Sequence, residues 1–154
     1  MEREPNHFAE AAMLIRKPIN IVYQSFVDPE TTTKFWFTKS SGHLSKGESV
    51  VWTWKMFNLD VKVNVIEMIK DEKIIIQWGE DPEAIVEWQF NKLGEEKTFV
   101  TITNTGFKGS PEELISQIRD STGGFTWVLA GLKAYLEHGI KLNLIQDRYP
   151  PELR

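Results

Sequence analysis

Apolar and polar residues alternate along five runs in the middle of the chain, and this period of two predicts β-strands. In each run, one set of alternate residues is apolar and often aromatic, and this set should face the core. These residues are Val50, Trp52, Trp54, Met56, Leu59, Val61, Val63, Val65, Ile74, Ile76, Trp78, Val86, Trp88 and Phe90. The last run is ambiguous, and we favour Val100, Ile102 and Asn104 as its inner residues. Because short glycine-containing turns separate the later runs, the pattern predicts an antiparallel meander with one covered face.

Before the meander, the pattern predicts one strand and two short helices. The strand covers His7 to Ile15. Pro18 then opens a helix, since apolar residues recur at helical spacing after it, at Ile19, Val22, Tyr23 and Phe26. Asp28 followed by Pro29 is a second helix-start signal, so another short helix is expected from Pro29 to about Phe37.

Two further helices are expected after the meander. Ser110 and Glu113 form a capping-box pattern, which predicts a short helix to about Asp120. The pair Gly123-Gly124 should break the chain before a long helix that runs to about Gln146. The stripe that should face the sheet is Phe125, Val128, Leu129, Leu132, Leu136 and Ile140. At about 100° per residue, Trp127 and His138 fall on the opposite side and are poor pocket candidates unless another element covers them.

The composition fits one globular domain over residues 1–154. Apolar residues make up 41% and charged residues 26% of the chain, a balance typical of folded domains. The net charge of -4 offers no broad cationic surface for nucleic acid or an anionic membrane. The absence of cysteine excludes disulfides and thiolate metal ligands. No leader pattern and no apolar run of about 18 residues is present, so we expect no membrane span and a cytoplasmic location.

Three segments carry a resemblance to a known family. They are Pro18 to Glu30 with the following Phe35-Trp36, I-I-I-Q-W at Ile74 to Trp78, and G-G-F-T-W-V-L-A-G-L-K-A-Y-L-E at Gly123 to Glu137. In order and spacing the chain resembles the START-like (SRPBCC) helix-grip superfamily, and within it bacterial homologues of the C-terminal domain of the activator of the heat-shock chaperone ATPase. The resemblance implies an α+β fold in which a long C-terminal helix covers a curved antiparallel sheet of about six to seven strands. Family members commonly have glycine directly before the tryptophan of the last helix, where this chain has Thr126.

The resemblance also implies a cavity between sheet and helix that holds a small apolar molecule such as a lipid or an aromatic polyketide. An apolar site with a few polar tips is the usual composition of such a pocket. The candidate ligand-binding residues are Trp52, Trp54, Trp78, Trp88, Phe90, Asn104, Leu132 and Tyr135. The alternative is that these aromatic residues simply fill the core.

Support for catalysis in the sequence is weaker. His7, His43 and His138 lack the spacing of metal ligands, and no nucleophile or phosphate-binding motif is present, so neither a metal nor a cofactor is expected. A cofactor-free cyclase or hydrolase would depend on Tyr135 or a buried carboxylate, but Glu87 is predicted on the outer face. A third reading, which the resemblance also suggests, is a chaperone-activator-like interaction module, with Trp127 in a protein-partner or homodimer contact.

Overall fold

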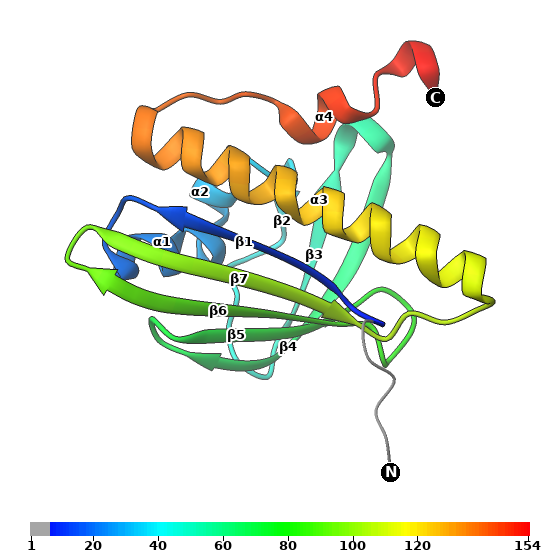
Figure 1. Cartoon of the computed structure of the whole chain (residues 1–154), viewed down its shortest axis with the longest axis horizontal. Helices are drawn as coiled ribbons and strands as arrows, with labels where there is room; N and C mark the ends of the chain where they lie inside the picture. The colour runs from blue at the N-terminus through cyan, green and yellow to red at the C-terminus, as the bar shows by residue number, and fades with distance from the viewer. Residues whose placement is uncertain (1–6) are drawn as a thin grey trace.

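The computed structural model describes residues 7–154 and contains a seven-stranded antiparallel sheet with the order β1-β7-β6-β5-β4-β3-β2 (Figure 1). The strands are β1 (Ala9–Ile15), β2 (Lys39–Ser40), β3 (Ser49–Trp54), β4 (Leu59–Ile69), β5 (Lys73–Trp78), β6 (Ile85–Gly94) and β7 (Lys97–Thr105). The helices are α1 (Ile19–Val27), α2 (Pro29–Thr32), α3 (Pro111–His138) and α4 (Leu144–Arg148), with the short 3-10 turns η1 (Lys55–Phe57) and η2 (Pro151–Leu153). The helix-grip architecture expected from the sequence is thereby confirmed.

The inner face of the sheet follows the predicted alternation. On β5, β6 and β7, the side chains of Ile74, Ile76, Val86, Trp88, Val100 and Ile102 are at most 1% exposed. Asn104 lies on the same face and is buried, which confirms the favoured reading of the last strand. The alternation fails at the hairpin between β3 and β4. Met56 belongs to η1 rather than to a strand, and Leu59 is exposed, because the chain leaves the sheet here through the left-handed residue Asn58.

Helix α2 is shorter than predicted. It ends at Thr32, five residues before Phe37, and the chain continues in turns. The three consecutive aromatic residues Phe35, Trp36 and Phe37 are all buried. A regular helix turns by about 100° per residue and could not direct three successive side chains into one core, so the irregular backbone is required here.

The long helix differs from the prediction at both ends. Helix α3 begins at Pro111 and runs without interruption through Gly123-Gly124, where the sequence predicts a break. Its start is the predicted capping box, in which the Ser110 hydroxyl accepts from the Glu113 amide and the Glu113 carboxylate accepts from the Ser110 amide. Its end comes at His138 rather than Gln146, because Gly139 takes the left-handed conformation that closes a helix, with φ 67°.

The covered stripe of α3 is largely the predicted one. Phe125, Val128, Leu129 and Leu132 are buried, and Leu136 packs against the core, whereas Ile140 lies beyond the helix and is exposed. After Gly139 the chain turns back along α3, and α4 reaches the end of the β3–β4 hairpin (Figure 1). Within residues 7–154, no helix is both long and apolar enough to cross a bilayer.

Candidate functional site

A pocket of about 410 Å³ opens between α3, one end of the sheet and the segment that contains α4. Six aromatic residues line it, namely Trp36, Trp78, Phe107, Phe125, Trp127 and Tyr149. They come from the segment after α2, the end of β5, the loop before α3, helix α3 itself and the end of α4. The pocket is therefore built from parts of the chain that lie far apart in sequence.

The aromatic rings on the inner side of the pocket are in mutual contact. Trp78 stacks on Phe125 with ring centroids 5.7 Å apart and an interplanar angle of 28°. Trp36 meets the same Phe125 ring at 5.7 Å in an edge-on arrangement. Behind them, Trp36 also contacts Trp52 and Trp88, so the pocket wall is continuous with the core. Such packing fixes the ring positions before any ligand arrives.

One polar pair lies among these rings. Asn104, on β7, is 5% exposed, and its side-chain amide donates to the Ser121 hydroxyl oxygen at 2.9 Å. Because Ser121 accepts this bond, its own hydroxyl proton stays available to a ligand. The pair gives the apolar pocket a polar tip, as is common in binding sites for small molecules.

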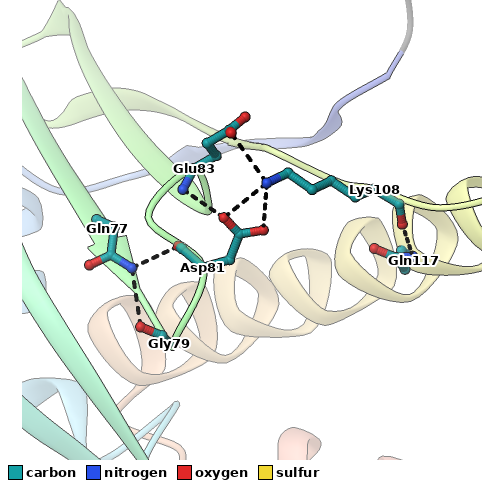
Figure 2. A network of polar contacts seen from close by, with 6 residues as sticks. All are labelled: Gln77, Gly79, Asp81, Glu83, Lys108 and Gln117. Carbon is teal, nitrogen blue, oxygen red and sulfur yellow. Dashed lines mark hydrogen bonds and ion pairs between the residues drawn. The ribbon is translucent and has the colours of Figure 1, made fainter.

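An ion cluster fixes the loop that carries Phe107. The Lys108 ammonium donates to Asp81 at 3.3 Å and to Glu83 at 3.2 Å, both in the turn between β5 and β6 (Figure 2). On the other side, the Gln117 side chain donates to the Lys108 carbonyl oxygen at 2.8 Å and joins the loop to α3. Two hydrogen bonds lower the pKa of the Asp81 carboxyl, and the one from the Glu83 amide has a larger effect than the one from Lys108. The hydrogen bonds that Lys108 donates to Asp81 and Glu83 raise the pKa of Lys108.

Two further contacts hold the same loops. The side chain of Gln77, at the end of β5, donates to the carbonyl oxygens of Gly79 and Asp81 at 3.1 and 2.8 Å (Figure 2). Gly106 has a φ of 94°, and a Cβ there would lie 1.9 Å from the Glu83 carbonyl oxygen. Only glycine permits this approach of the two loops. This side of the pocket is thus positioned by the Gln77 hydrogen bonds and by the close approach of Gly106 to Glu83.

The outer wall comes from the returning C-terminal segment. Ile145 packs against the core, and the Tyr149 ring meets Phe57 of η1 edge-on at 5.7 Å. Arg154 donates to the Met56 carbonyl oxygen at 2.7 Å, and its guanidinium lies 4.8 Å from the centre of the Phe57 ring. The segment is thereby tied to the hairpin between β3 and β4.

Two of the eight predicted ligand-binding residues, Trp78 and Asn104, line this pocket. Five others are core residues that do not line it: Trp52, Trp54, Trp88, Phe90 and Leu132. Phe37 fills the space over the inner face of the sheet at Trp52, since the two rings stack with centroids 4.6 Å apart. Tyr135 lies at a separate surface depression beside Glu30 and Lys34. The ligand-binding role of the eight residues stays a prediction.

The sequence reasoning missed most of the pocket wall. The helical spacing makes Trp127 a poor candidate unless another element covers its side of the helix; this condition is met, and Trp127 lines the pocket and is 38% exposed. This side is covered by α4, through Ile145 and Arg148, and by Tyr149 directly after it. The available signal was Gly139, a helix-ending residue, followed by a short apolar and aromatic segment that could fold back. His138, the other residue on that side, is exposed and does not line the pocket.

The titratable residues offer little acid-base chemistry inside the pocket. Among the lining residues, Asp120 and Arg148 carry charge, and both are exposed at the rim. Glu87 lies on the outer face, where it accepts a hydrogen bond from Gln89 and pairs with Lys73 at 3.9 Å. Residues 7–154 contain no group of three or more histidine, aspartate or glutamate residues placed to hold a metal ion. Tyr135, the acid-base candidate of the cyclase or hydrolase hypothesis, lies outside the pocket.

Comparison with models of known protein families shows the family of this chain. A family model described as "Activator of Hsp90 ATPase homolog 1-like protein" matches residues 16–137. The chain belongs to this family. Its match covers the interval from the end of β1 to nearly the end of α3. A search of curated proteins found no significant match.

Solved structures share the fold. The protein SSP2350 from Staphylococcus saprophyticus is 26% identical, with a TM-score of 0.77 over 88% of this chain and 95% of that chain. DynU16, from the dynemicin biosynthetic locus, is 18% identical with a TM-score of 0.77, over 89% of this chain and 49% of that one. The Aha1 dimer from Colwellia psychrerythraea is 16% identical with a TM-score of 0.73, over 86% and 97% of the two chains. The latter two likenesses show a common fold.

Proposed function

We propose that this protein reversibly binds a small, largely apolar molecule with aromatic character in the pocket beneath α4. The observation that carries the proposal is a pocket of about 410 Å³ whose wall contains six aromatic residues. Binding sites for small molecules typically have volumes of about 300–1,000 Å³ and few polar groups. Large flat rings provide apolar contact area and stacking partners for a planar ligand.

The arrangement of the wall supports a preformed site. The inner side rests on the core through Trp36 and Phe125, and the loop that carries Phe107 is held by the Lys108 cluster. A ligand that enters such a site orders few side chains, which limits the entropic cost of binding. The outer wall, formed by Ile145 and Tyr149, is the part that a ligand would displace most easily, because α4 contains no buried residue.

A thermal-shift screen tests the proposal, with tryptophan fluorescence followed in parallel. The panel contains fatty acids, flavonoids, other aromatic polyketides and sterols. A ligand that binds only the folded protein raises its melting temperature by mass action. We expect a concentration-dependent shift with at least one aromatic class, together with a change in tryptophan emission.

Matched variants locate the response. Trp127→Ala removes an indole ring that lines the pocket, so it should reduce the ligand-induced shift in melting temperature. Because Trp127 is 38% exposed, the variant should still fold. Ile115 lies on the same helix, is 61% exposed and does not line the pocket, so the variant Ile115→Ala should leave the ligand-induced shift unchanged. A panel without any shift, or shifts equal in both variants, would argue against a ligand site here.

Binding to an Hsp90-type chaperone is a second candidate function, favoured by the match of residues 16–137 to the activator family model. It predicts saturable binding to the chaperone and a changed rate of its ATPase. If the chaperone contact and the small-molecule site are separate, Trp127→Ala will affect only ligand binding. An unchanged ATPase rate at saturating protein would exclude the chaperone role.

A further inference from the structure

The rim of the pocket carries two charged residues of opposite sign, Arg148 and Asp120. Arg148 is the last residue of α4, and its guanidinium carbon lies 4.7 Å from the centre of the Tyr149 ring. Among the described residues, no carboxylate lies within ion-pair distance of the Arg148 side chain. The Arg148 guanidinium therefore lies at the edge of an aromatic pocket, held over the Tyr149 ring, and none of the described carboxylates forms an ion pair with it.

We propose that the ligand of this pocket is an aromatic molecule with an anionic group, such as a carboxylate or sulfonate, and that Arg148 recognises this group. The inference rests on the proposed function, since it names the ligand class of the same site. The aromatic body of the ligand lies against Trp78, Phe125 and Trp127, and its anionic group lies at the rim. The planar guanidinium is suited to such a group, because it can donate two parallel hydrogen bonds to it.

The Ser121 hydroxyl, one of the polar groups that line the pocket, also favours a ligand with a hydrogen-bond acceptor. The Ser121 hydroxyl already accepts from Asn104 at 2.9 Å, which leaves it a proton to donate. A cationic ligand could in principle use the aromatic faces. However, the guanidinium of Arg148 lies over the Tyr149 ring at the rim, where it would repel a second cation.

Asp120 allows the sign of the ligand's charge to be tested, because its carboxylate lines the same pocket as Arg148 and carries the opposite charge. An anionic ligand that contacts Arg148 is repelled by Asp120. Neutralising Asp120 should therefore strengthen binding of an anionic ligand, and neutralising Arg148 should weaken it. A cationic ligand would reverse both effects.

Two fluorescent probes with the same aromatic skeleton test the inference. The probe 1-anilinonaphthalene-8-sulfonate carries one sulfonate, and N-phenyl-1-naphthylamine is neutral. We expect Arg148→Gln to lower the affinity for the sulfonate probe about tenfold, which corresponds to about one charge-assisted hydrogen bond. The affinity for the neutral probe should change less than about twofold in the same variant. Asp120→Asn should raise the affinity for the sulfonate probe alone.

Arg119→Gln is the matched control, because Arg119 is an exposed arginine of α3 that does not line the pocket. It removes the same net charge and should affect neither probe. Equal losses in Arg148→Gln and Arg119→Gln, or no loss in either, would overturn the role of Arg148 while the pocket stands. If neither probe binds, or if both bind unchanged to Trp127→Ala, the proposed function fails as well.

Discussion

Replacing Gly123 and Gly131 of α3 by alanine, one at a time, should change the stability of the protein by clearly different amounts. Both residues lie inside one helix, where alanine is favoured over glycine by about 1 kcal/mol. At Gly123 an added Cβ would meet no atom within 4 Å. We therefore expect Gly123→Ala to raise the free energy of unfolding by about 1 kcal/mol.

The same methyl group at Gly131 meets a fixed neighbour. Its Cβ would lie 3.1 Å from the Phe35 Cβ and 3.3 Å from the Phe35 carbonyl oxygen. Phe35 is buried, and its ring packs edge-on against Phe26 at 5.5 Å, so this segment has little freedom to retreat. Overpacking of a core by a methyl group costs about 1–3 kcal/mol. After the helix-propensity gain is subtracted, Gly131→Ala should lose roughly 0–2 kcal/mol.

Urea unfolding followed by circular dichroism measures both variants against the unchanged protein. The propensity gain is common to both, so the difference between them, about 1–3 kcal/mol, isolates the cost of pushing α3 away from Phe35. The displacement should also reach the pocket, because Trp36 adjoins Phe35, and only Gly131→Ala should weaken ligand binding. Equal stabilisation by the two substitutions would refute the close packing at Gly131.

Three further predictions concern the anchoring of α3 and the limits of the pocket. Burial raises the pKa of Glu137, but hydrogen bonds from Lys133 and from the Arg16 amide outweigh it and bring the pKa below its ordinary value. At pH values above its unfolded-state pKa, the Glu137 carboxylate thus stabilises the fold. This stabilisation disappears as the pH falls through the lower pKa that Glu137 has in the folded protein. Glu137→Gln should cost about 1–3 kcal/mol at neutral pH and flatten the loss of stability on acidification, as measured by unfolding at a series of pH values; an unchanged acid profile would contradict this. Phe90→Leu should cost about 1 kcal/mol without changing ligand affinity, because Phe90 contacts Tyr23 and Phe26 rather than the pocket; a loss in titrations as large as that of Trp127→Ala would return Phe90 to the site. Gly124→Ala should stabilise α3 as Gly123→Ala does, yet it places a methyl group in the pocket wall and should lower the affinity for the bulkiest ligands of the panel; equal affinities in the two glycine variants would show that the ligand does not approach Gly124.

The strand pattern could be predicted because the alternation of a β-strand is a local property. Once Trp88 faces inward, Val86 and Phe90 must do so too, and the pairing of Trp88 with Ile102 extends the same parity to β7. The inward position of Asn104 follows from this parity. The capping box at Ser110 was equally predictable, since it depends on residues three positions apart.

The sequence by itself thus determined most of the strands, their inward-facing residues and the start of α3, because these depend on patterns among residues close together in the chain. Only the tertiary structure decided that α3 continues through Gly123-Gly124 and that the chain turns back after Gly139. Helix propensity disfavours the two glycines by about 2 kcal/mol in total, but burial of Phe125 and its neighbours against distant strands outweighs that cost. The return of the chain then brings Arg148 and Tyr149 into the wall of the pocket that Trp78 and Trp127 also line. A pocket made of such distant residues depends on packing between elements, which no local pattern in the sequence encodes.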